Sequence, residues 1–210
     1  MTKYFSKDCL YYFRRVMTNP IDSFYEIRYR DYGSVPIALI CVAIFGLTFT
    51  INRIFAHFVV NDVNPLTVNG LTEMRVVFLM FFLFCVGNWS ITCLMNGEGR
   101  LKDIMTVVGY SLVPLIVILI PVTLISHVIA AGEEVFYYFA IAIGIGWSAI
   151  LVLLGIMTVH NYSLAKTLIT LFLTFVSMFI LIFIALLMYS LINQLYVFLY
   201  SVYTELVFRF

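Results

Sequence analysis

Five uncharged, strongly apolar runs are the feature that most constrains the fold of this 210-residue chain. They cover residues 33–52, 76–95, 105–132, 135–159 and 167–204. A helix needs about 20 apolar residues to cross the hydrocarbon core of a bilayer, so each run is long enough. Hydrophobic residues make up 63% of the sequence and charged residues 11%, against about half and about a quarter in a soluble domain. We therefore predict an all-α membrane protein with five transmembrane helices.

The fifth run is too long for one straight crossing. At about 1.5 Å per residue, a helix over residues 167–204 reaches well past a hydrocarbon core of about 30 Å. We expect the helix to leave the core near Asn193 and Gln194. Residues 195–207, rich in Tyr and Phe, would then lie in the far interface or project beyond it.

The distribution of basic residues predicts the orientation. With the N-terminus in the cytoplasm, only Arg53, Arg75 and Arg209 would lie outside, which leaves nine of the twelve basic residues inside. Positively charged loops are retained on the cytoplasmic side of a membrane, so this orientation is favoured. Five crossings then place the C-terminus outside.

We expect residues 1–34 to form a cytoplasmic preface to a membrane domain over residues 35–210. Apolar residues recur at helical spacing within residues 3–17, which favours a short amphipathic helix on the membrane surface, with a solvated tail as the alternative. A second helix is predicted to begin at Asn19 and Pro20, because Asn can cap a helix and Pro is tolerated at its first position.

The loop over residues 96–103 lies between the second and third apolar runs and carries two glycines, which allow a tight turn. Asp103 can cap the helix that follows. The simpler interpretation of the 96–103 loop is a solvated connection between two helices. The functional interpretation is that the loop and the second helix together form a docking surface for a cytoplasmic partner. The residues predicted to contact that partner are Pro20, Phe24, Ile27, Arg28, Arg30, Glu98, Arg100, Lys102 and Asp103.

Polar side chains also occur at membrane depth, at Asn88, Thr92, Tyr110 and Ser111. Polar groups in lipid form hydrogen bonds between helices, so we expect these residues to join neighbouring helices, with a transport site as the alternative. The middle of each apolar run lacks Asp, Glu, Lys and Arg, which counts against an ion-coupled transporter.

Chemistry-bearing motifs are not evident in the sequence. The GxG of the 96–103 loop lacks the following Lys and Ser or Thr of a phosphate cradle, and the three histidines and four cysteines form no metal-ligand pattern. We predict no enzymatic activity, no cofactor and no metal. A net charge of +1 gives no electrostatic case for nucleic acid.

Several short motifs carry a resemblance to a known family. They are NPIDSFYEIRYRDYGS at 19–34, NW at 88–89, NGEGRLKDI at 96–104, GYSLVP at 109–114 and GIMTVHNYSLAKT at 155–167. With five spans and a cytoplasmic N-terminus, the chain resembles the bacterial branch of the Yip family, membrane proteins named in eukaryotes for interaction with Ypt/Rab GTPases.

The resemblance implies a membrane adaptor without catalytic residues. Bacterial relatives of this type resemble proteins found beside carbohydrate ABC importers, which implies an accessory subunit that docks on the permease, or on its cytoplasmic ATPase, in the bacterial cytoplasmic membrane. Two other functions stay open at this point. One is a small stand-alone transporter or channel, and the other is a lipid-organising or membrane-shaping protein.

Overall fold

The computed structural model describes residues 15–30 and 33–209. Its elements are α2 (Pro20–Tyr29), α3 (Val35–Phe55), the 3-10 helix η1 (Pro65–Thr67), α4 (Gly70–Leu94), α5 (Leu101–Ser111), α6 (Val113–Ile125), α7 (Glu134–His160) and α8 (Leu164–Arg209). The described part of the chain is all-helical, without strands. Five helices, with α5 and α6 counted together, are long and apolar enough to cross a membrane. The predicted all-α class with five membrane-length helices is therefore confirmed.

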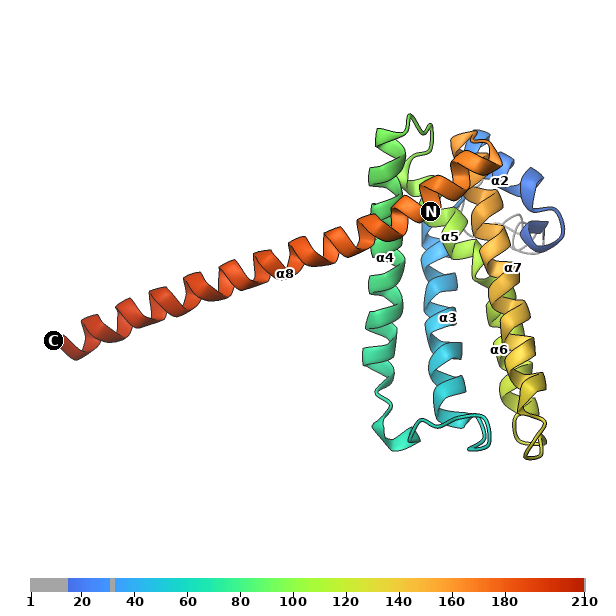
Figure 1. The fold of residues 1–210 in the computed structure, drawn as a ribbon, viewed down its shortest axis with the longest axis horizontal. Coiled ribbons are helices and arrows are strands. Elements are labelled where there is room, and N and C mark those ends of the chain that lie inside the picture. Colours follow the sequence, from blue (N-terminus) through green and yellow to red (C-terminus); the bar gives the residue numbers. More distant parts are fainter. Residues whose placement is uncertain (1–14, 31–32, 210) are drawn as a thin grey trace.

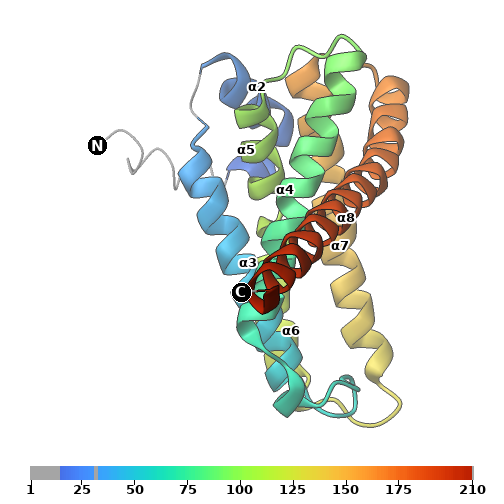
Figure 2. The same ribbon diagram turned by 90° about the vertical axis from the view of Figure 1, so that its left-hand side faces the viewer.

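Four of these helices form a bundle, and the fifth leaves it. In Figure 1, α3, α4, the α5–α6 pair and α7 run alongside one another, whereas α8 crosses α4 and projects sideways. One end of the bundle carries α2, the 95–100 loop and the turn at 161–163, and we call it the α2 end (Figures 1 and 2). The opposite end carries the connections at 56–69 and 126–133. Which end faces the cytoplasm stays a prediction from the charge distribution.

The helix α5 lies at the centre of the packing. It contacts α2, α3, α4 and α7. From Asp103 to Pro114 every residue is buried except Met105 and Leu112, which are partly buried. Small and branched side chains on all sides of α5 allow four neighbours to approach it. The third apolar run is consequently the most buried of the five membrane-length helices.

The third run is interrupted at Leu112, two residues before Pro114. Proline has no backbone N–H, and its ring clashes with the carbonyl group four residues earlier, so it ends a continuous helix. Here α5 ends at Ser111, and Pro114 occupies the first turn of α6, where its missing N–H costs little. Pro121 lies inside α6 without ending it.

The start of α4 corrects one predicted boundary. The second apolar run begins at residue 76, but α4 begins at Gly70 and includes both Glu73 and Arg75. The side chain of Asn69 caps the helix, because its Oδ1 accepts the N–H of Leu71 at 3.1 Å. Glu73 lies in the first turn, where the positive end of the helix dipole stabilises an acidic side chain.

The helix α8 has 46 residues and is continuous, so no break marks the expected exit at Asn193 and Gln194. At 1.5 Å per residue it is about 69 Å long. Its first part packs on α4 through a buried stripe of small polar residues, Thr167, Thr170, Thr174 and Ser177. Every residue from 182 to 203 is exposed. The helix predicted over residues 3–17 lies outside the described residues, apart from 15–17, which are helical.

Candidate functional site

A buried carboxylate at the α2 end joins α2 to α5. The Oδ2 atom of Asp103 accepts hydrogen bonds from Arg28 Nη1 at 3.2 Å, from Arg100 Nε at 2.9 Å and from the Arg100 backbone N–H at 3.2 Å. The Asp103 side chain is only 3% exposed. Because a buried charge is costly without partners, two guanidinium groups on this carboxylate hold α2 against the start of α5. Asp103 thus caps α5 from its third residue rather than from the position before it.

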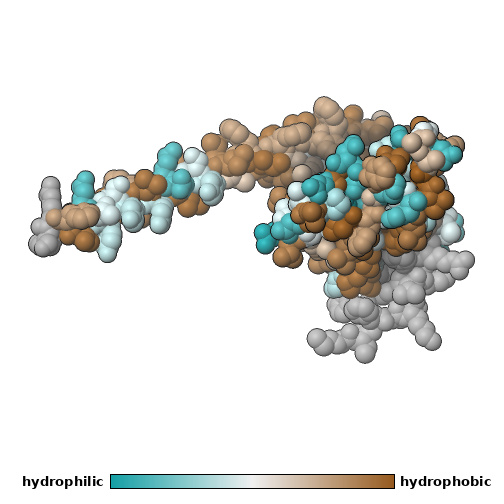
Figure 3. Space-filling view, turned by 90° about the horizontal axis from the view of Figure 1, so that it is seen from below, coloured by the Kyte–Doolittle hydropathy of each residue, from teal (hydrophilic) through white to brown (hydrophobic). Residues whose placement is uncertain are grey.

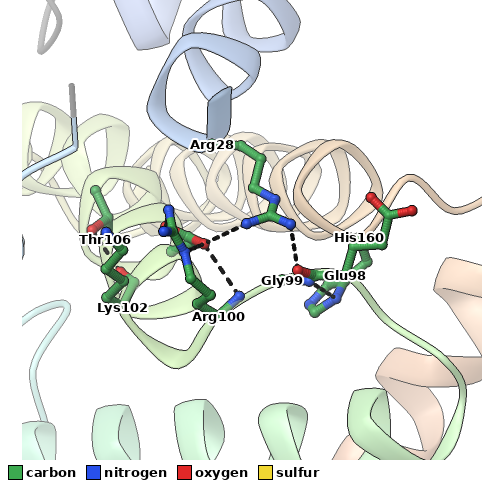
Figure 4. A network of polar contacts seen from close by, with 8 residues as sticks. Arg28, Glu98, Gly99, Arg100, Lys102, Thr106 and His160 are labelled. Atoms are coloured by element: carbon green, nitrogen blue, oxygen red, sulfur yellow. Dashed lines mark hydrogen bonds and ion pairs between the residues drawn. The ribbon is translucent and has the colours of Figure 1, made fainter. Parts of the chain in front are cut away.

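The same arginine also fixes the loop that precedes α5. Figure 4 shows the Arg28 side chain extending from α2 toward the loop that carries Glu98 and Gly99, with His160 beside that loop. Arg28 Nη2 donates to the Glu98 carbonyl group, and the Gly99 N–H donates to His160 Nδ1 at 3.1 Å. A Cβ atom at position 99 would lie 2.5 Å from His160 Cε1, so glycine is needed for the loop to approach α7 this closely.

Two helices end beside this loop in the same way. Asn96 and Asn161 both have positive φ angles, 54° and 53°, and each follows the last turn of its helix, α4 or α7. Asparagine is one of the few residues other than glycine that tolerates this conformation. The Tyr162 hydroxyl group donates to the Met95 carbonyl group at 3.1 Å, which joins the two helix ends. Burial raises the pKa of the Tyr162 phenol, and Cys93 adds to the effect, so the hydroxyl group remains a neutral donor.

The structure brings the two predicted partner-contact segments together but divides their side chains into two groups. Phe24, Ile27 and Asp103 are buried, and the Arg28 side chain is 16% exposed. These four residues dock α2 on α5 and α7, so their side chains are covered in this structure. The residues that remain at the surface are Arg30, Glu98, Arg100 and Lys102, with Pro20 partly exposed. Partner contact at these positions stays a prediction.

The outer face of α2 carries a stripe that the sequence interpretation missed. Ile21, Tyr25 and Tyr29 lie four residues apart, and each is about half exposed. The Tyr25 and Tyr29 rings pack together with their centroids 4.5 Å apart. In the structure α2 has one apolar face toward the core and a second, aromatic face toward the outside.

The four predicted intramembrane polar residues are all buried. Asn88 joins two helices, because its Nδ2 donates to Thr174 Oγ1 of α8 at 3.0 Å. Thr92 and Ser111 instead donate to carbonyl groups of their own helices, Trp89 at 3.0 Å and Val107 at 2.8 Å. Tyr110, with 1% of its surface exposed, belongs to the core around α5.

A second interhelical contact was not predicted. Asn52 of α3 donates to Thr123 of α6 at 2.8 Å and accepts from the Tyr137 hydroxyl group of α7 at 3.0 Å. The amide at position 52 is thereby shared by three helices near the opposite end of the bundle. The sequence placed Asn52 at the boundary of its apolar run, where an amide is as compatible with a helix end as with a buried contact.

A family model described as the Yip1 domain matches residues 14–187. The chain belongs to the Yip1 domain family. No curated protein and no solved structure matches it.

The Yip1 domain covers the helical bundle but not the outer half of α8. The match includes α2 to α7 and the part of α8 that packs on α4, and therefore the whole Arg28–Asp103 cluster. It ends at residue 187, whereas α8 continues to Arg209. The exposed outer half of α8 thus lies almost entirely beyond the Yip1 domain.

Proposed function

We propose that this Yip1 domain protein is a non-enzymatic membrane adaptor that holds an integral membrane partner through the outer half of α8. The observation that carries the proposal is the two-sided character of residues 189–207, which follows a stretch that is apolar all round. In Figure 3 the part of α8 nearer the bundle is brown, and teal and pale residues appear along its outer part.

The two faces of this outer segment can be read from its spacing. On one side, the segment carries polar residues at helical spacing, Ser190, Gln194 and Ser201. On the other side, the same spacing gives an apolar stripe of Ile192, Leu195, Leu199, Val202 and Leu206. All eight side chains are exposed, and the five apolar ones are each at least 40% exposed. Such segregation is typical of a helix that buries one face against another surface.

The apolar stripe continues the face of α8 that already packs against a helix. Ser177 faces α4 and is 8% exposed, and Leu195 follows it by about five full helical turns. Ser177 and Leu195 therefore point in nearly the same direction along a straight helix. Where α8 extends past α4, this face is still apolar and exposed. That character supports the packing of another helix against it.

The partner we propose is the permease of an ABC-type carbohydrate importer, in keeping with the resemblance of the sequence to accessory proteins of such importers. A lateral contact along α8 suits a permease, whose transmembrane helices present apolar faces for packing. The exposed Arg30, Glu98 and Lys102 at the α2 end provide a charged surface for the associated ATPase. This arrangement assumes the predicted cytoplasmic N-terminus and a bacterial cytoplasmic membrane.

Affinity purification in mild detergent tests the proposal. We expect the tagged chain to retain a permease in a reproducible ratio. Replacement of Leu195 and Leu199 with Gln on the apolar stripe should remove the partner, whereas replacement of Val197 and Ser201 with Gln on the opposite side of the helix should leave it bound. A wild-type chain that elutes alone would contradict the adaptor function. Equal loss in both variants would contradict the assignment of the face.

One observation favours membrane shaping as a second candidate function. The outer stripe of α2, Ile21, Tyr25 and Tyr29, places two aromatic rings at the α2 end of the bundle, where amphipathic aromatic side chains favour the membrane interface. Reconstituted vesicles should then change shape with the wild-type chain and not with a variant that has Ser at positions 25 and 29. An unchanged effect of the variant argues against this function.

A further inference from the structure

A pocket opens at the opposite end of the bundle, beside the 126–133 connection that joins α6 to α7 (Figure 1). Its volume is about 360 Å³, within the range of small-molecule sites. Ile129 of the connection and Phe136 of α7 line its sides, and Val122 of α6 and Tyr137 of α7 line its inner part. Val122 and Tyr137 are 6% and 5% exposed, so the pocket extends into the apolar core at this end.

One carboxylate belongs to this otherwise apolar pocket. Among the described residues that line it, Glu133 is the only one with a charge. Its Oε2 atom accepts the N–H of Ala130 at 3.3 Å, which holds the carboxylate next to the lining residue Ile129. In the part of the chain that the structure describes, Glu133 forms no salt bridge. Its negative charge is therefore not compensated by a basic side chain.

The start of α7 compensates only part of this charge. A helix N-terminus is equivalent to about half of a positive elementary charge. Glu133 precedes α7 and Glu134 is its first residue, so two carboxylates lie beside that half charge. Glu134 Oε1 also accepts an uncharged backbone group, the N–H of Gly132, at 3.4 Å. The mouth of the pocket therefore has a net negative charge, which is complementary to a cation.

An aromatic ring and an apolar wall extend the site beyond the carboxylate. Phe136 lines the pocket and is 72% exposed, so its ring lies at the mouth. An ammonium group is attracted to the face of an aromatic ring as well as to a carboxylate. Ala140 lines the pocket seven residues after Glu133, about 10.5 Å further along the chain of α7. A ligand along this wall would place its charge at Glu133 and hydrocarbon from there to Ala140.

We propose that this pocket binds one single-chain amphiphile that has a primary ammonium group. The ammonium group lies at the Glu133 carboxylate, and the hydrocarbon chain lies along the apolar walls. A neutral or anionic head group lacks the attraction to Glu133, and a water-soluble amine lacks the hydrocarbon that the apolar walls accept. The site requires no permease, so it goes beyond the adaptor function and can fail or succeed independently of it.

Native mass spectrometry of the detergent-purified full chain tests the site, with dodecylamine and dodecanol as probes of equal chain length. Dodecylamine carries an ammonium group at neutral pH, as a lysine side chain does, whereas dodecanol is uncharged. We expect one dodecylamine to be retained per chain, about fivefold more tightly than dodecanol, which is the ratio that a good exposed ion pair gives. The Glu133→Gln variant should retain both probes equally, because glutamine keeps the size and the acceptor oxygen but not the charge.

The matched control is Glu134→Gln, which removes the neighbouring carboxylate. Glu134 does not line the pocket, so this variant should keep the preference for dodecylamine. Ala140→Trp fills the pocket and should abolish retention of both probes, whereas Ala142→Trp, at an exposed position outside the pocket, should not. Equal retention of the two probes by the wild-type chain would overturn the proposal. So would an equal effect of the two variants within either pair, because retention would then not depend on this pocket.

Discussion

In the Arg28–Asp103 ion pair, we expect replacement of the two partners to lower the unfolding free energy by unequal amounts. In the Asp103→Asn variant, an uncharged amide replaces the carboxylate that Arg28 and Arg100 share. Hydrogen bonds to charged groups contribute about 1.5–3 kcal/mol each, but the Arg100 side chain is 47% exposed, so its contribution is small. We expect a loss of about 2–3 kcal/mol in unfolding free energy, mainly from Arg28, which stays largely buried without its counter-charge.

The Arg28→Met variant should cost less, about 1 kcal/mol. Asp103 would keep both the guanidinium group and the backbone N–H of Arg100. The Glu98 carbonyl group that loses Arg28 is exposed and can bind water instead. Methionine also preserves much of the aliphatic packing of the arginine stem. The carboxylate is thus the more important member of the pair.

The assay is denaturant unfolding in mixed micelles, followed by the labelling of buried thiols. Cys41 and Cys85 are free and buried, so a thiol-reactive dye reports their exposure when the bundle opens. Glu98→Gln is the matched control, because that variant removes a carboxylate from the same loop but keeps the main-chain acceptor, and its effect should stay within about 0.5 kcal/mol. The reasoning is refuted if Arg28→Met destabilises the protein more than Asp103→Asn does.

Two further substitutions test packing inside the bundle. Gly155→Ala should destabilise the protein by about 1–3 kcal/mol, because a Cβ atom there meets the Val107 side chain, whereas Gly146→Ala, with no atom within 4 Å, should be neutral or slightly stabilising in the same assay. Asn88→Ala should cost about 0.5–2 kcal/mol through loss of the contact with Thr174, and an unchanged unfolding midpoint would show that this hydrogen bond does not hold α8 on α4.

The number and approximate extent of the membrane helices could be predicted from the sequence because both depend on local composition. An uncharged run of sufficient length has to become a helix in lipid, and Pro114 interrupts its helix through the backbone chemistry of one residue. Boundaries at capped ends were less predictable. By composition alone, Glu73 and Arg75 belong to a loop. They lie in α4 because the Asn69 cap and the helix dipole stabilise the first turn of that helix.

Contacts between residues far apart in the sequence were beyond prediction. Arg28 and Asp103 are separated by 75 positions, and each one alone is as compatible with a solvated charge as with a buried pair. The same holds for Asn52, which Thr123 and Tyr137 satisfy from two other helices. The direction of α8 was also not predictable, because apolar residues on every side of residues 178–188 do not specify which neighbour the helix selects.

Photo-crosslinking in intact cells tests the central claim most directly, that the apolar stripe of α8 contacts an integral membrane partner. A photoreactive amino acid is placed at Leu195 in one variant and at the adjacent Tyr196 in another, positions that are 59% and 65% exposed. We expect position 195 to form an adduct with a transporter permease and position 196 to form none. Adducts with lipid alone at position 195, or the same protein adduct from both positions, would contradict that claim.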